Sequence, residues 1–293
     1  MLARYVADLV ADELAHLRPG GVRLPERPWP TGLALDEEGL GLDSLERLSV
    51  ASAVNEALHL HESGLEDLLL ARRHFGEWLQ VAVDGLSVFD ARLSFRTSGS
   101  SGVGKACTHA LVNLLQEVEY LATLLPDIRR VLTAVPAHHI YGFLFTGLLP
   151  HRLGCRQVID IRRMTPQALT SILQPGDLVV SHPAHWALLA RHAGRLPPAV
   201  HGVTSTAPCP DALALSLSAL GLETLTQVYG SSKTAGIGTR TLPDAPFTLM
   251  PFWSRDAGDE QRLLRTSADG AYPSCVLQDH VTWRDARCFS VCG

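Results

Sequence analysis

Short apolar segments alternate with helical patterns through the middle of this 293-residue chain. The strand candidates lie at 92–95, 131–135, 158–160, 178–181, 200–205 and 224–228. Helical periodicity lies between them, as at 107–125 and 183–192. Such alternation is typical of βαβ units, which place parallel strands side by side and cover the sheet with helices. We therefore predict an α/β fold, a layered core with a largely parallel sheet.

The first part of the chain has a different, mainly helical pattern. Apolar residues at helical spacing predict a helix over 1–17, and a loop rich in Pro and Gly follows at 18–42. Two more helical stretches are expected, one beginning at Asp43 and the other over 65–78. We therefore divide the chain into a small helical unit, 1–82, and an α/β core, 83–293, whose final segment again has the pattern of strands.

The composition excludes several classes of protein. Apolar residues make up 46% of the chain and charged residues 19%, and with a net charge of −5 and no basic stripe, nucleic acid is not an expected partner. Neither a secretory signal nor an apolar run long enough for a membrane span is visible. The cysteines are scattered without a C-x-x-C pair, so we expect free thiols in a reducing, cytoplasmic compartment.

A loop rich in Gly and Ser follows the first strand candidate. It contains Thr97, Ser98, Gly99, Ser100, Ser101 and Gly102, and ends at Gly104 and Lys105. Backbone N–H groups at glycines approach phosphate oxygens closely, hydroxyls add donors, and lysine adds positive charge. A flexible linker is the plain alternative, but a strand before the loop and a helix expected after it favour phosphate binding. The Walker A frame also matches, except that Ala106 stands where that frame needs a hydroxyl for Mg²⁺.

The same loop resembles the phosphate loop of the acyl-adenylate-forming (AMP-binding) superfamily, which includes acyl-CoA synthetases and 4-coumarate–CoA ligases. The run from Thr97 to Gly102, then Lys105 and Thr108-His109, matches that pattern, with Gly104 where the family usually has proline. Further segments match in the same order down the chain. The resemblance implies an adenylating-enzyme core that binds ATP or AMP, with the loop and Lys105 holding the β- and γ-phosphates.

Two later segments are implied to border the acyl group and the nucleotide. Within 136–143, His139 has the family's spacing to Gly142, which implies that His139, Tyr141 and Gly142 line the acyl pocket. A histidine with a purely structural role is the plain alternative. Another segment contains Ser205, Thr206 and Ala207, and it resembles one that lines the adenine and acyl sites. That segment, 202–210, also ends a strand and starts a helix at Pro210-Asp211, which is an ordinary helix entry.

A fourth segment is implied to hold the rest of the nucleotide. It consists of Tyr229, Gly230, Ser231, Ser232 and Lys233, and it resembles the family's Tyr-Gly-x-Thr-Glu. The resemblance implies that Tyr229 stacks on adenine, Ser232 contacts the α-phosphate and Asp279 binds the ribose, although Asp279 also suits a simple turn. Lys233 replaces the family's Mg²⁺-binding glutamate, and a charged lysine cannot ligate a cation. Mg²⁺ is still expected to accompany ATP, but no residue of this chain is assigned as its ligand.

The helical front carries one further motif. Asp43-Ser44-Leu45 resembles the acyl carrier protein motif, in which the serine receives phosphopantetheine. Asp43 and Glu46 also have the spacing of a capping box, which explains the same residues as a helix start. Three interpretations stay open for Ser44: a modified carrier serine, a carrier-like unit that is never modified, or a plain helix start.

The combined prediction is an enzyme that uses ATP to activate an aryl or fatty carboxylic acid as acyl-AMP and transfers the acyl group to a thiol of CoA or an acyl carrier protein. Lys105, His139 and Ser232 are the expected catalytic residues. The small C-terminal domain of the family is expected to be absent from this shortened member. The alternatives are a degenerate nucleotide- or acyl-binding module, a fragment that needs a partner chain and, less favoured, a Walker-type kinase or NTPase.

Overall fold

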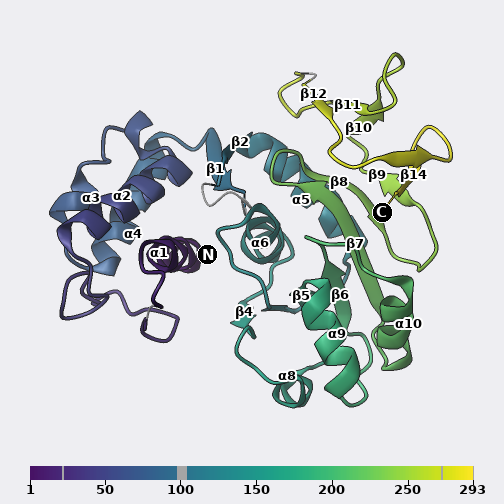
Figure 1. Cartoon of the computed structure of the whole chain (residues 1–293), viewed down its shortest axis with the longest axis horizontal. Coiled ribbons are helices and arrows are strands. Elements are labelled where there is room, and N and C mark those ends of the chain that lie inside the picture. Colours follow the sequence, from purple (N-terminus) through teal and green to yellow (C-terminus); the bar gives the residue numbers. More distant parts are fainter. Residues whose placement is uncertain (22, 98–103, 272, 293) are drawn as a thin grey trace. The chain divides into compact units, whose positions relative to one another are not determined.

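The computed structural model describes residues 1–21, 23–97, 104–271 and 273–292 (Figure 1). They form two compact units. The first consists of Met1–Leu111 and Pro136–Phe143, and the second of Val112–Val135 and Leu144–Gly293. The chain therefore returns to the first unit for one short segment, the one that contains His139.

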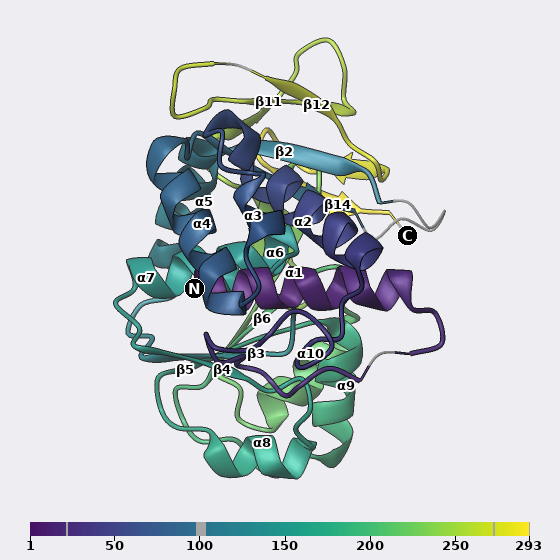
Figure 2. The same ribbon diagram turned by 90° about the vertical axis from the view of Figure 1, so that its left-hand side faces the viewer.

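Helices dominate the first unit. In chain order its elements are α1 (Leu2–Leu17), α2 (Ser44–Leu58), the 3₁₀ turn η1 (Leu60–Glu62), α3 (Leu68–Ala71), α4 (Phe75–Val88), β1 (Arg92–Arg96), β2 (Ala106–Ala110) and α6 (Ile140–Phe143). Helix α1 packs against α2 and α4 (Figure 2). Its apolar stripe is buried, and Tyr5 meets Phe95 of β1 and Phe143 of α6 edge to face, with ring centroids 6.4 and 5.5 Å away. The core of this unit is therefore shared by helices and the β1–β2 hairpin.

The predicted helix start at Asp43 is confirmed. One Asp43 carboxylate oxygen accepts hydrogen bonds from the backbone N–H groups of Leu45 and Glu46 at 2.8 Å each, and the Glu46 carboxylate accepts one from Asp43 N–H at 3.1 Å. The prediction of one helix over 65–78 is wrong, because α3 ends at Ala71 and α4 begins at Phe75. His74 between them is extended and, with Glu77, starts a new capping box.

The prediction of a helix over 107–125 is wrong in its first part. Residues Ala106–Ala110 form β2, which pairs antiparallel with β1, and α5 (Leu111–Leu124) begins only after that strand. The pairing sets Cys107 opposite Phe95, and both side chains are buried. Pairing and burial within the first unit therefore make residues 106–110 a strand. The Gly-rich loop consequently connects two strands of a hairpin and does not lead into a helix.

A mixed sheet forms the second unit and confirms the predicted α/β class. Among the described residues it has nine strands in the order β13-β14-β9-β8-β7-β6-β5-β3-β4. Five are parallel: β4 (Gln157–Asp160), β3 (Arg130–Thr133), β5 (Asp177–Ser181), β6 (His201–Thr204) and β7 (Thr224–Ser231). The others extend it antiparallel: β8 (Ala235–Arg240), β9 (Phe247–Leu249), β14 (Cys288–Val291) and β13 (Val281–Trp283).

Helices pack on the parallel strands to make the core of this unit (Figure 1). They are α8 (Pro166–Ile172), α9 (Pro183–His192) and α10 (Asp211–Ala219). Trp186 of α9 is fully buried, and its indole N–H donates to the Val203 carbonyl of β6 at 3.2 Å. A Cβ at Gly202 would lie 2.8 Å from that ring, so glycine lets the helix approach the sheet. This packing fixes helix α9 against strand β6, which pairs with β7.

Two smaller parts complete the second unit. The π-helical turn η2 (Leu144–Leu148) leads into α7 (Leu149–Arg152). A separate antiparallel sheet contains β10 (Trp253–Arg255), β11 (Arg262–Arg265) and β12 (Ser274–Val276). The predicted return of strands near the end of the chain is thus confirmed. Within the described ranges, no helix has both the length and the apolar character to cross a membrane.

Candidate active site

The two ends of the Gly-rich loop lie face to face in the β1–β2 hairpin. Thr97 N–H donates to the Lys105 carbonyl at 3.0 Å, and Lys105 N–H donates to the Thr97 hydroxyl at 3.0 Å. Ser98, Gly99, Ser100, Ser101 and Gly102, which the sequence assigns to phosphate binding, lie outside the described residues. The hairpin brings the two described ends of this predicted phosphate loop together, and the Lys105 side chain is exposed.

Gly104 differs from the proline that the family pattern expects, and the hairpin gives a reason. A Cβ at Gly104 would lie 2.4 Å from the Thr97 carbonyl oxygen, closer than real Cβ atoms come to their neighbours. The close approach of the two strands next to the loop therefore requires glycine in this chain.

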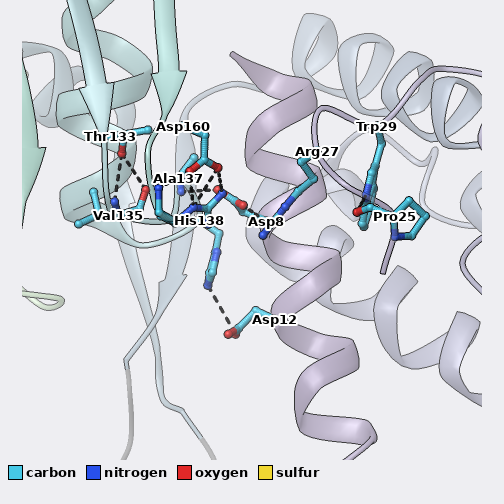
Figure 3. Close-up of polar contacts among 11 residues, drawn as sticks. Asp8, Asp12, Pro25, Arg27, Trp29, Thr133, Val135, Ala137, His138 and Asp160 are labelled. Carbon is cyan, nitrogen blue, oxygen red and sulfur yellow. Dashed lines mark hydrogen bonds and ion pairs between the residues drawn. The ribbon is translucent and has the colours of Figure 1, made fainter. Parts of the chain in front are cut away.

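Carboxylates of helix α1 contact Ala137 and His138, which precede His139 in the chain (Figure 3). The buried carboxylate of Asp8 accepts a hydrogen bond from Ala137 N–H at 2.7 Å and is paired with Arg27. One turn later, Asp12 Oδ2 lies 3.5 Å from Nε2 of the buried His138. Two carboxylates of one helix thus hold consecutive residues of the 136–143 segment, which sequence reasoning did not foresee.

The three residues predicted to line the acyl pocket lie in the same segment. A Cβ at Gly142 would lie 1.9 Å from the Pro136 carbonyl oxygen, so the turn into α6 requires glycine. Tyr141 is buried and His139 is half-buried. Burial, followed by the neighbouring His138 ring 4.2 Å away, lowers the pKa of His139 to about 4. The imidazole is therefore neutral at pH 7 and suits contact with an uncharged aromatic or acyl group.

A cavity of about 370 Å³ lies in the second unit, where β7 and β8 join. Its lining includes Tyr229, Gly230, Ser231, Lys233, Thr234 and the stretch 274–279. Tyr229 donates its hydroxyl hydrogen to Asp279 Oδ2 at 3.0 Å, and burial followed by the Asp279 charge raises the pKa of Tyr229 above its ordinary value. Residues 50 positions apart in the chain are thus joined at one pocket.

Four other predicted nucleotide residues are not part of the described lining of this pocket. Ser205 follows β6, and its hydroxyl donates to the Val228 carbonyl of β7 at 2.9 Å. Thr206 and Ala207 are exposed, and Thr206 has a positive φ of 77°. Ser232 lies in the β7–β8 turn and is half-buried. The described lining therefore contains Tyr229, Gly230, Ser231, Lys233 and Asp279 among the predicted residues, and leaves Ser205, Thr206, Ala207 and Ser232 outside it.

The pocket offers little to a divalent cation. Asp279 supplies the one carboxylate among its described lining, whereas a protein-held Mg²⁺ usually has more than one oxygen ligand from the protein or substrate. Lys233 is exposed at the position where the family has its metal ligand. In the described part of the chain, the one group of three side chains suited to a metal is His59, His61 and Glu62, in the first unit. The residues at the pocket therefore do not fit a protein-held Mg²⁺.

One buried carboxylate, bonded to strand β8, was not among the residues predicted from the sequence. Glu117 of α5 is fully buried and accepts Gly236 N–H, with its two oxygens 3.0 and 3.2 Å from that nitrogen. Burial raises the pKa of Glu117 to about 7, against the opposing charge of Arg265. A signal was available, because Glu117 follows the buried Leu114 by three positions and so lies on the apolar face of the helix.

Comparisons with known proteins identify the family of this chain. A family model described as "AMP-binding enzyme" matches residues 86–256, more than half of the chain. Two curated relatives are named 4-coumarate–CoA ligase. The one from Rhodobacter capsulatus is 41% identical over 97% of this chain and 73% of its own length, and the one from Halorhodospira halophila is 38% identical over 99% and 73%. Since these alignments cover nearly all of this chain, its helical front is part of the stretch shared with the ligases.

Solved structures show the same fold. An acyl-CoA synthetase (AMP-forming)/AMP-acid ligase II-like protein from Dyadobacter fermentans matches with a TM-score of 0.57 at 19% identity, over 75% of this chain and 64% of that one. O-succinylbenzoate coenzyme A synthetase from Bacillus subtilis, solved with ATP and magnesium ion, matches with a TM-score of 0.56 at 16% identity, over 68% and 49%. This chain thus spans about half to two thirds of those structures.

Fold, family match and relatives define the class of this protein as an acyl-adenylate-forming acid–thiol ligase. The chain belongs to the AMP-binding enzyme family, and the Walker-type kinase alternative is set aside.

Proposed function

We propose that this chain activates an aryl carboxylic acid of the hydroxycinnamate type with ATP and transfers the acyl group to the thiol of CoA. The observation that carries the nucleotide part is the pocket in which Tyr229 and Asp279 meet, since one aromatic ring and one carboxylate suit an adenine and a ribose diol. The names of the curated relatives favour an aryl acid over a fatty acid.

The reaction has two steps. A carboxylate oxygen of the acid attacks the α-phosphorus of ATP, the bond to the bridging oxygen breaks, and pyrophosphate leaves. The thiolate sulfur then attacks the acyl carbon and expels AMP. Both steps depend on positioning and on charge stabilisation of phosphates more than on proton transfer by a protein side chain.

Each predicted residue has a role in this proposal. Lys105 and the loop from Thr97 to Gly102 hold the β- and γ-phosphates, and Ser232 contacts the α-phosphate. Tyr229 takes the adenine and Asp279 the ribose, with Gly230, Ser231, Ser205, Thr206 and Ala207 beside them. His139, Tyr141 and Gly142 border the acyl group, and the neutral imidazole of His139 avoids placing a charge against the ring of the acid. Mg²⁺ enters as part of the ATP complex, because the pocket holds no suitable protein ligand.

The experiment is ATP–pyrophosphate exchange with 4-coumarate, benzoate and a medium-chain fatty acid. Exchange that is strongest with the aryl acids supports the proposal, and nucleotide binding without exchange with any acid favours the non-catalytic binding module. If exchange is strongest with the fatty acid, the substrate is a fatty acid and not an aryl acid, while the adenylation reaction stands.

An acyl carrier protein is the second candidate acceptor, and Ser44 is the related candidate for phosphopantetheine. The supporting observation is that Ser44 is exposed as the first residue of α2, where a transferase would need it. The intact mass of the chain after incubation with CoA and a phosphopantetheinyl transferase tests this directly. An unchanged mass retires the carrier role, and Ser44 is then a helix start within the ligase body.

A further inference from the structure

Lysine is rare in this chain. Of its 25 lysines and arginines, only Lys105 and Lys233 are lysines. Lysine presents a compact ammonium with three rotatable donors, whereas arginine presents a wide planar fork. Lys105 closes the Gly-rich loop and Lys233 lines the pocket of Tyr229 and Asp279. Both lysines thus occur in segments proposed to hold ATP, and all other members of the lysine and arginine set are arginines.

Lys233 is available to an anion. Its side chain is exposed at the pocket, where it is the one basic group among the described lining. Within the described residues it makes no ion pair, and the acidic lining group, Asp279, already accepts a hydrogen bond from Tyr229. A ligand that brings negative charge into this pocket therefore meets an ammonium that makes no ion pair within the described residues.

The turn that carries Lys233 is held firmly on both sides. The Thr234 hydroxyl oxygen accepts a hydrogen bond from the Ser231 N–H, with 3.1 Å between nitrogen and oxygen, and it lies 3.0 Å from the Ser231 hydroxyl oxygen, with which it is also hydrogen-bonded. Beyond the turn, Gly236 N–H donates to the buried Glu117, and the Gly236 carbonyl accepts the indole N–H of Trp253 at 2.8 Å. The backbone of residue 233 is therefore positioned by buried contacts, while its four-carbon stem remains free to reach a ligand.

We infer that Lys233 is a phosphate-binding residue of this pocket, whose ammonium donates to a phosphate oxygen of the bound nucleotide. The inference rests on the proposed function, because it takes ATP as the ligand of the pocket. It adds a cationic contact to a pocket whose described lining has a single carboxylate, that of Asp279.

The test compares the affinities of ATP and adenosine, measured by isothermal titration calorimetry on the whole chain. The variants are Lys233→Gln, Lys233→Arg and, as a control for charge, Arg284→Gln. Arg284 is an exposed cation of the same unit that does not line the pocket. We expect Lys233→Gln to weaken ATP about tenfold, the order of one charged hydrogen bond, and to leave adenosine unchanged. Lys233→Arg should retain part of the ATP affinity, and Arg284→Gln should change neither ligand.

Two outcomes overturn the inference while the proposed function stands. One is parent-like ATP affinity in Lys233→Gln, and the other is an equal loss for ATP and adenosine, which indicates a damaged pocket. If the parent binds neither ligand, both proposals fail. A second readout uses the scarcity of lysine: after reductive labelling with pyridoxal 5′-phosphate, peptide mapping should show Lys233 protected by ATP, and an unprotected Lys233 contradicts the contact.

Discussion

Replacing Glu117 by glutamine is expected to change how the stability of the second unit depends on pH. Glutamine has nearly the same shape and keeps an acceptor for Gly236 N–H, but it cannot ionise. In the parent, burial raises the pKa of Glu117 from 4.5 to about 7, with Arg265 as the one charged group that opposes the shift. The carboxylate therefore holds its proton more tightly in the folded chain than in the unfolded chain.

The sign and size follow from linkage. Between pH 4.5 and 7 the unfolded chain releases this proton while the folded chain keeps it, so the contribution of Glu117 to stability falls as pH rises. A shift of about 2.5 pKa units corresponds to about 3 kcal/mol, reached above pH 7. The free energy of unfolding of Glu117→Gln relative to the parent should therefore rise by about 3 kcal/mol between pH 4.5 and pH 8.

Urea unfolding followed by tryptophan fluorescence at several pH values measures this difference, and subtracting the parent curve cancels the titration of all other groups. Glu119→Gln is the matched control on the same helix. Glu119 is exposed and paired with Arg152, which lowers its pKa, so its replacement should favour the parent at higher pH. A difference for Glu117→Gln that does not vary with pH would refute the claim that this buried carboxyl has a raised pKa.

Three further predictions concern the site. Tyr229→Phe removes the donor to Asp279 and should weaken ATP several-fold in calorimetry with an unchanged circular dichroism spectrum. Gly104→Ala brings a Cβ within 2.4 Å of the Thr97 carbonyl, so it should lower both melting temperature and exchange rate, and a parent-like variant would show that the hairpin relaxes freely. Asp8→Asn leaves Arg27 without its partner charge and should raise KM for the acid more than KM for ATP in steady-state assays, whereas equal increases would mean general unfolding.

The sequence predicted the elements whose signals are local. The capping box at Asp43 fixes a helix start through bonds within a few residues, and α9 follows the predicted bounds because Pro183 begins it and a helical pattern continues to His192. The parallel strands were predicted from short apolar runs between helices. Their burial on the sheet agrees with that pattern.

The elements that tertiary contacts decide were predicted wrongly or not at all. Helical spacing continues through 106–110, yet pairing with β1 makes that segment a strand. No local pattern indicates that Tyr229 and Asp279 are hydrogen-bonded, because they lie 50 positions apart in the chain. Asp8 and Asp12 looked like ordinary polar residues of an amphipathic helix, because nothing in their neighbourhood indicates that 136–143 packs against them.

The most direct test of adenylation by this chain is ATP–pyrophosphate exchange with 4-coumarate for the parent and for Lys105→Ala. We expect exchange that depends on the acid in the parent and falls at least a hundredfold in the variant, since a phosphate-stabilising charge is typically worth that much in the transition state. Exchange that persists unchanged in Lys105→Ala would contradict the assignment of the Gly-rich loop to ATP.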